Sequence, residues 1–217
     1  GGFDNLRVYA VVGGNYGEIW GTKFARVTDK DSQYYGQLIT TKEGRPTATS
    51  DIEKIGDQQA TGLLGWNNTL TYKHWSLGFM IDARLGGEIF SGTMQAMQSA
   101  GTAACTVVDG KREDIVLEGV YMDENGVYQK NTSAITPEKY WGRVTSATGN
   151  NGIGEANIYS ADNIRLRNVS LAYRVPSSWL KNTVIQSLKA GVTVTNVWMI
   201  HSKMNGLDPE SIFATST

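Results

Sequence analysis

The sequence of 217 residues is poor in the side chains that form covalent cross-links and metal sites. It contains one cysteine, Cys105, and two histidines, His74 and His201. A single cysteine cannot form an internal disulfide, and three such side chains cannot supply the four Cys and His ligands of a structural zinc site. We therefore expect no disulfide framework, no zinc and no other cofactor.

Long apolar runs and an excess of one charge are also missing. The longest unbroken apolar run is five residues, Val8–Val12, whereas a transmembrane helix needs about 20. The formal net charge is −1, which gives no electrostatic reason to expect nucleic acid as a partner. The chain starts Gly1-Gly2-Phe3, without Met or a signal-peptide pattern, so we expect a processed or excised fragment.

What the sequence does contain is alternation, most clearly from Trp75 to Leu85. Side chains of a strand point alternately to its two faces, so eleven alternating residues predict a strand with one apolar and one polar face. The polar face carries Asp82 and Arg84. The apolar face carries Trp75, Leu77, Phe79, Ile81, Ala83 and Leu85.

Two strand pairs are predicted from this pattern. The run 64–72 precedes the first strand, and only Lys73-His74 separate them, which predicts a tight two-residue hairpin. The runs 163–175 and 187–200 form the second pair, separated by Pro176 and a serine-rich turn. Within the run 163–175 the apolar phase changes, and a β-bulge near Arg167-Asn168 would reconcile the two phases.

The remaining segments are more polar and more varied. Further strands are expected at 6–12, 18–27, 34–41 and 115–122, giving about eight or nine strands at roughly ten residues each. Short helices are expected at 91–104 and from Pro137, with Thr136 as its N-cap. Short connections (73–74 and 176–181) should lie at one end of the sheet, and the long ones (86–115 and 142–158) at the other.

Alternating strands of about ten residues, with short turns at one end and long loops at the other, are typical of outer-membrane β-barrels. A barrel must close, because an open sheet edge in lipid leaves backbone groups unpaired. The same alternation also fits a soluble two-layer β-domain. The pattern alone leaves both architectures open.

Catalytic groups are not indicated. Asp109, Glu113, Asp114 and Glu118 lie close in sequence, as glycosidase carboxylates could, but their Gly and Lys-Arg neighbours favour a solvated loop. The segment 123–126 lacks the full ligand spacing of a calcium loop and favours a plain turn. Cys105 has no identifiable base beside it. We expect that the chain is not an enzyme.

Six further segments of the sequence can be read together: 17–21, 68–87, Tyr140-Trp141, 158–176, 195–198 and 207–210. Together they resemble the late-barrel region of SusC/RagA-type TonB-linked outer-membrane receptors. They occur in the family's order and span nearly the whole chain. The plug, the TonB box and the final barrel strand of the family have no counterpart in these residues.

The resemblance implies a mainly β fold: residues 1–217 would be the C-terminal portion of a large antiparallel up-and-down barrel of about 22 strands, with short helices in its long loops. It implies an outer-membrane TonB-dependent importer of glycans or other nutrients in a Gram-negative bacterium. The partners would be the rest of the receptor, a SusD-like surface lipoprotein, TonB through the N-terminal part, and the lipid bilayer. The alternative is a soluble secreted or surface β-domain that binds carbohydrate.

Two sets of candidate site residues follow. Charged residues on polar strand faces either line the barrel lumen or form ion pairs within the wall; they are Asp82, Arg84, Arg165 and Arg167. Aromatic residues near strand ends and turns would form the membrane-interface girdle in a barrel, or core and sugar-stacking residues in a soluble domain; they are Trp66, Tyr72, Trp75, Tyr173, Trp179 and Trp198.

Overall fold

The computed structural model of the chain describes residues 2–3, 5–145, 152–181, 183–204 and 206–210. These residues form two compact units. The first unit contains residues up to 59 together with residues 88–159, and the second contains residues 60–87 and 160–210. Both are rich in antiparallel strands and contain few and short helices, so the expected mainly β class is confirmed.

Short strands arranged in several small sheets form the first unit. A four-stranded antiparallel sheet has the order β1 (Gly2–Phe3), β2 (Leu6–Ala10), β3 (Tyr16–Gly21), β5 (Glu53–Asp57). A second sheet joins β11 (Tyr128–Lys130), β10 (Gly119–Met122) and β4 (Leu38–Ile39), and its β10–β4 pair is parallel. Two further pairs are β12 (Ala134–Ile135) with β9 (Ile115–Val116), and β13 (Ile158–Ser160) with β8 (Glu88–Phe90).

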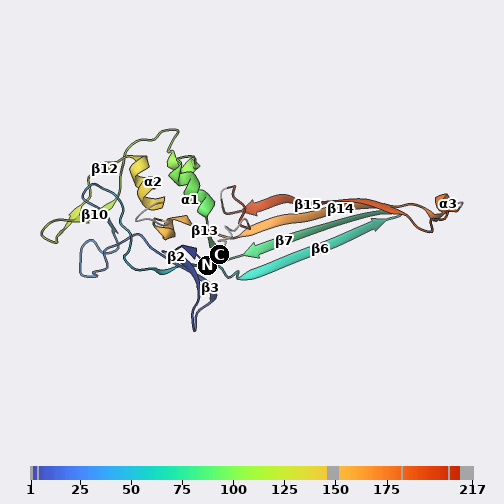
Figure 1. Cartoon of the computed structure of the whole chain (residues 1–217), viewed down its shortest axis with the longest axis horizontal. Coiled ribbons are helices and arrows are strands. Elements are labelled where there is room, and N and C mark those ends of the chain that lie inside the picture. The colour runs from blue at the N-terminus through green and yellow to red at the C-terminus, as the bar shows by residue number, and fades with distance from the viewer. Residues whose placement is uncertain (1, 4, 146–151, 182, 205, 211–217) are drawn as a thin grey trace. The chain divides into compact units, whose positions relative to one another are not determined.

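Two capped helices pack together in the first unit (Figure 1). They are α1 (Gly92–Ser99) and α2 (Pro137–Thr145), accompanied by the 3-10 turns η1 (Ala104–Thr106) and η2 (Gly154–Asn157). Ser91 caps α1, because its Oγ accepts a hydrogen bond from the Met94 N–H at 3.2 Å. Thr136 Oγ1 accepts from the Lys139 N–H at 3.3 Å, so the predicted N-cap of α2 is confirmed.

The first unit has a hydrophobic core of the kind found in soluble domains. Its members come from strands, loops and α2, and they are almost completely shielded from solvent. The most deeply buried aliphatic side chains are Ile19, Val27, Val120, Val144 and Ile153.

The second unit is a single sheet of four long antiparallel strands (Figure 1). The strand order is β15 (Lys189–Ser202), β14 (Asn163–Arg174), β7 (Trp75–Leu85) and β6 (Gly62–Tyr72), and the short α3 (Ser177–Leu180) lies in the β14–β15 connection. In the described part of the chain, no helix has the length and apolar character needed to cross a membrane.

The register of this sheet confirms the predicted hairpin. Pairing runs without interruption from Gly62↔Leu85 to Tyr72↔Trp75, so Lys73 and His74 alone form the turn. Lys73 adopts a φ of 54°, the left-handed conformation that Asn-Gly turns adopt more readily. The His74 carbonyl accepts from the Arg174 N–H at 2.8 Å, so the connection after β14 begins at this same sheet end.

The residues that connect β7 to β14 leave and return at the opposite sheet end. The Asp162 carboxylate accepts a hydrogen bond from the Gly86 N–H, and the Gly87 carbonyl accepts from the Ala161 N–H at 2.9 Å. The expected separation of short and long connections at the two ends of the sheet is therefore confirmed for these strands.

The predicted bulge in β14 is also present. Leu166 lies opposite Ile81 and Asn168 lies opposite Met80, so Arg167 is the extra residue. This insertion changes the phase of β14, which puts Ile164 and Leu166 on the same face as Val169 and Leu171.

Three other strand predictions are wrong in detail. The strand expected at 18–27 is β3, which ends at Gly21, and the residues after it form only isolated bridges. Residues 34–41 contain only the two-residue β4, because a turn closes at Gly36, whose φ is +78°. Residues 115–122 divide into β9 and β10, which pair with different partners. The described part of the chain contains fifteen strands, rather than eight or nine, and four of these exceed ten residues.

Candidate functional site

The four-stranded sheet has the two chemically different faces that the sequence predicts. Cross-strand partners in a sheet share a face, so the register assigns each side chain. On one face, apolar residues form rows across the strands; one such row is Leu70, Leu77, Leu171 and Val192. On the other face, the matching row is Thr71, Ser76, Ala172 and Gly191.

The apolar face is exposed. Among the described residues, none of the buried apolar side chains belongs to β6, β7, β14 or β15. Leu70 is 56% exposed and Val192 is 70% exposed. A continuous apolar surface of this kind on a folded chain marks a face that contacts another apolar phase, either protein or lipid.

Aromatic residues lie in two rows on this face. Tyr72, Trp75 and Tyr173 form the first row next to the hairpin turn, and the Trp75 and Tyr173 rings are 4.8 Å apart. Trp66 and Trp198 belong to the second row, which continues through Ile81 and Leu166. Trp66 and Tyr72 are six positions apart in β6, about 20 Å along the strand.

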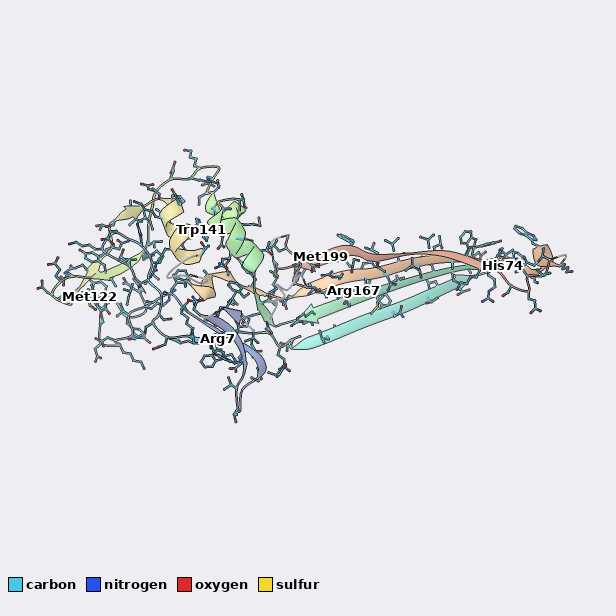
Figure 2. All side chains as sticks on the ribbon, viewed as in Figure 1. Arg7, His74, Met122, Trp141, Arg167 and Met199 are labelled. Atoms are coloured by element: carbon cyan, nitrogen blue, oxygen red, sulfur yellow. The ribbon has the colours of Figure 1, made fainter. Side chains whose placement is uncertain are left out.

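Trp179, the last of the predicted aromatic residues, lies in α3 and is exposed. Figure 1 shows α3 beyond the hairpin end of the sheet, the end at which Figure 2 labels His74. Four of the six predicted aromatics therefore lie at or beyond the hairpin end, and the other two form a row farther along the strands. This arrangement agrees with the prediction that they cluster near strand ends and turns, except for Trp66 and Trp198.

A cluster of charged residues occupies the polar face, away from the hairpin. Arg165 lies opposite Asp82, and Asn163 lies opposite Arg84. Arg167, labelled in Figure 2, projects from the bulge, and its Nε donates to Asp82 Oδ2 at 2.7 Å. The predicted charged residues are thus brought together by β7 and β14.

Two residues beyond β15 complete the cluster. Arg165 donates to both carboxylate oxygens of Asp208, at 3.2 and 2.5 Å. Arg167 donates to both oxygens of Glu210, with one of these bonds at 2.7 Å. Such two-pronged pairs are among the stronger and more directional ion pairs in proteins.

These contacts show ion pairing at Asp82, Arg165 and Arg167, with partners that sequence reasoning missed. Asp208 and Glu210 belong to one of the segments that carry the resemblance, yet nothing in the spacing of 165 and 208 brings them together. The available signal was the matching repeat: two arginines two residues apart and two carboxylates two residues apart.

The electrostatics of the cluster favour its ionised state. The Arg165 guanidinium lowers the pKa of Asp208, and the Arg167 guanidinium lowers the pKa of Glu210. Nε of Arg165 and Oδ1 of Asp82 are buried, and within the described residues neither has a hydrogen-bond partner. The cluster therefore contains one donor and one acceptor, next to its ion pairs, that could each form a further hydrogen bond.

Further contacts hold the polypeptide that follows β15 near the cluster. Met204 is 2% exposed and Pro209 is buried. Lys203 pairs with Asp162, whose pKa is lowered mainly by this contact. A cavity of about 550 Å³ lies beside Arg165 and Asp208, and its other lining residues include Trp198 and His201.

The first unit contains a second cleft, of about 500 Å³. Three of the four carboxylates considered for catalysis line it: Asp109, Glu113 and Asp114. Its wall also includes Tyr140 and Trp141, whose rings are 5.0 Å apart. Glu113 forms an ion pair with Lys111 at 3.3 Å, and both are highly exposed, as expected for a solvated loop.

Other chemical candidates have simple structural roles in the described residues. Asp123 Oδ1 accepts from the Asn125 and Val127 N–H groups, so segment 123–126 forms the predicted turn. Cys105 is exposed and lies 3.8 Å from Gln98 Nε2. Within the described part of the chain, no three His, Cys, Asp or Glu side chains are grouped so that they could hold a metal ion.

Comparison with known proteins adds a relative. Over 211 residues the chain is 28% identical to TonB-dependent receptor P3 of Formosa agariphila, an alignment that covers 97% of the chain and 18% of that receptor. No protein-family profile matches the chain. The chain is thus related to a TonB-dependent receptor over nearly all of its residues, and spans less than a fifth of that receptor's length.

Proposed function

We propose that this chain is part of an outer-membrane TonB-dependent importer of the SusC/RagA type, and that β6, β7, β14 and β15 are strands of its transmembrane barrel. The exposed apolar face carries this proposal. Exposing this apolar face to water would be unfavourable, whereas in a bilayer the lipid chains would cover it.

The dimensions of the sheet support the same assignment. β6 and β7 are each 11 residues long, and a membrane-spanning strand needs about 9–11. Phe79 lies between the two aromatic rows, as a lipid-facing residue near the middle of a bilayer would. The outer edges of β6 and β15 would pair with neighbouring strands of a barrel of about 22 strands.

The family resemblance and the relative together define the wider proposal. The imported compounds would be glycans or other nutrients, with energy supplied through TonB and a SusD-like lipoprotein acting as surface partner. In this arrangement the polar face with Asp82, Arg84, Arg165 and Arg167 lines the lumen, and the first unit supplies loops outside the membrane. The chain itself would perform no catalysis.

The test uses the full-length receptor that contains this chain. Folded outer-membrane barrels migrate faster on gels without heating, so the receptor should show heat-modifiable migration and fractionate with the outer membrane. A strain lacking it should lose growth on one class of glycan, and TonB deletion should cause the same loss. Growth unchanged on all nutrients tested, with the receptor present in the outer membrane, would contradict the import function.

A second candidate is a soluble carbohydrate-binding β-domain. The observation that favours it is the first unit, which has a buried core and a cleft walled by Tyr140 and Trp141. The two candidates differ in their need for detergent. A monomeric chain of residues 1–217 in detergent-free buffer would favour the soluble domain, and aggregation that detergent prevents would favour the barrel.

A further inference from the structure

The arginine cluster on the polar face is covered by a segment that does not belong to the sheet. Residues 206–210 follow β15 and return over β14, where Asp208 and Glu210 reach Arg165 and Arg167. We call residues 206–210 the returning segment. Its two charged side chains are carboxylates, and both form ion pairs with the two arginines.

The charges of the sheet and of the returning segment balance each other. On its polar face near this end, the sheet carries Arg84, Arg165 and Arg167 against Asp82, an excess of two positive charges. Asp208 and Glu210 supply two negative charges. With the returning segment in place the cluster is neutral; without it, three guanidinium groups lie near one carboxylate, which forms its ion pair with Arg167.

Burial is unequal between the two sides of these ion pairs. The Arg165 side chain is 7% exposed, whereas the Asp208 side chain is 44% exposed and the Glu210 side chain is 41% exposed. The Arg165 side chain is thus buried, whereas the carboxylates that pair with the arginines remain in contact with solvent. A buried guanidinium needs an anionic partner, and a partner that is itself in contact with solvent can be replaced by another anion that makes the same two-pronged contacts.

The site also has room and an unused donor. The cavity beside Arg165 measures about 550 Å³, enough for a small organic molecule. Arg165 Nε is buried, and no hydrogen-bond partner reaches it from the described residues. A guanidinium offers its donors in a planar fork that suits carboxylates, which is how it already binds Asp208.

We propose that Arg165 and Arg167 form a binding site for a soluble polycarboxylate, and that Asp208 and Glu210 are an internal stand-in for this ligand. A ligand with two or more carboxylates displaces the returning segment and takes its place on the two guanidiniums. The returning segment therefore acts as an acidic latch. This inference goes beyond the proposed import function, because it concerns binding and release at one face of the sheet.

The binding test uses citrate and the full-length receptor in detergent at pH 7, with calorimetry as the readout. The latch variant combines Asp208→Asn with Glu210→Gln and should bind citrate about tenfold more tightly than the wild type, because nothing charged competes for the arginines. The site variant combines Arg165→Gln with Arg167→Gln and should not bind. Equal affinities in the wild type and the latch variant would overturn the proposal.

Glu124→Gln is the matched control, because it removes a highly exposed carboxylate that pairs with Lys42 in the first unit. Its citrate affinity should equal that of the wild type. Acetate at the same ionic strength should not bind measurably to any variant, since it offers one carboxylate. Heat-modifiable migration checks that each variant is folded. If the barrel assignment is wrong, the receptor will not show this migration, whereas citrate binding to the arginines is measured separately by calorimetry. Failure of one proposal can therefore be told from failure of the other.

A second measurement needs no variant. Trypsin can cleave after Lys203, which immediately precedes buried Met204 and is held by Asp162. Displacement of the returning segment should expose this bond, so citrate should accelerate cleavage about tenfold over acetate at equal ionic strength. An unchanged cleavage rate in citrate would contradict the latch, whatever the result of the transport assays.

Discussion

The two units of this chain differ in how many of their apolar side chains are buried. Of the twelve buried apolar side chains in the described residues, ten lie in the first unit; Ala161 and Met204 belong to the second, and neither is in its four long strands. The first unit is stabilised from within, as soluble domains are. The second is a sheet whose apolar face is left uncovered.

The charged clusters of the two units differ in the same way. In the first unit, Glu18 pairs with Lys54 at 2.7 Å and accepts from Trp20 Nε1 at 3.0 Å, which joins residues of β3 and β5. In the second unit, the arginines of β14 are paired with a segment outside the sheet. The first cluster links two strands of one sheet, whereas the second binds the returning segment to the face of a sheet.

The largest expected effect concerns the core of the first unit. Ile19 is 1% exposed, and Ile19→Ala would leave a cavity that costs about 2–5 kcal/mol. Hydrogen exchange of the full-length receptor should show faster opening of β2, β3 and β5. Val116→Ala, at an exposed position in β9, is the control and should have little effect. Equal effects of the two changes would mean that the first unit is not stabilised by its core.

The next prediction separates the two faces of the sheet. Phe79→Arg would place a charge on the apolar face between the aromatic rows and should cost about 2–4 kcal/mol if that face contacts lipid. Asn67→Arg places the same charge on the opposite face, where Asn67 is exposed beside Met80. It is a better control than Gly78→Arg, since a Cβ at Gly78 would lie 2.6 Å from Ser170 Oγ.

Folding of both arginine variants in lipid can be followed by heat-modifiable migration of the full-length receptor. We expect loss of folding at Phe79 and near-normal folding at Asn67. Equal tolerance at both positions would contradict a lipid-facing assignment of the apolar face.

The regions that sequence reasoning predicted well are those in which one periodic signal dominates. Eleven alternating residues fixed the faces of β7, and the change of phase in 163–175 located the bulge at Arg167. The short strands of the first unit were predicted poorly, because two or three residues hold too little pattern. β4 is an example: its strand partner β10 lies about 80 residues away, and no local signal encodes that pairing.

The candidate site was predicted in part for a similar reason. Alternation placed Asp82, Arg165 and Arg167 on polar positions, but it could not name their partners. Those depend on how the chain turns after β15, which brings Asp208 and Glu210 back onto β14. An interaction over 43 residues is set by tertiary packing, so it required the structure.

A smaller effect is expected from acid in the first unit. The pKa of Glu18 is lowered by its hydrogen bonds from Lys54 and Trp20, and the pKa of Asp57 is lowered chiefly by Asn15. A lowered pKa in the folded state means that the stabilisation is present above the ordinary pKa and is lost as the pH falls through the folded value. Exchange of β3 and β5 amides, corrected for intrinsic rates, should accelerate below about pH 4.

The Glu18→Gln variant tests the origin of this pH dependence. It should exchange faster than the wild type at pH 7 and show a weaker change between pH 7 and pH 3. Glu124→Gln serves as the control, because the Glu124 side chain is 94% exposed. If amide exchange in the Glu18→Gln variant depends on pH as it does in the wild type, the acid sensitivity arises from other groups.

The smallest expected effect compares the helices of the two units. Ser91 caps α1 with its side chain and is buried, so Ser91→Ala should cost about 1 kcal/mol in the first unit. α3 begins after Pro176 and has no side-chain cap, so Ser177→Ala should leave the stability of the second unit unchanged. Hydrogen exchange of the α1 amides measures the first change, and heat-modifiable migration measures the second. An effect at Ser177 as large as that at Ser91 would show that α3 is held by contacts as specific as those that hold α1 in the first unit.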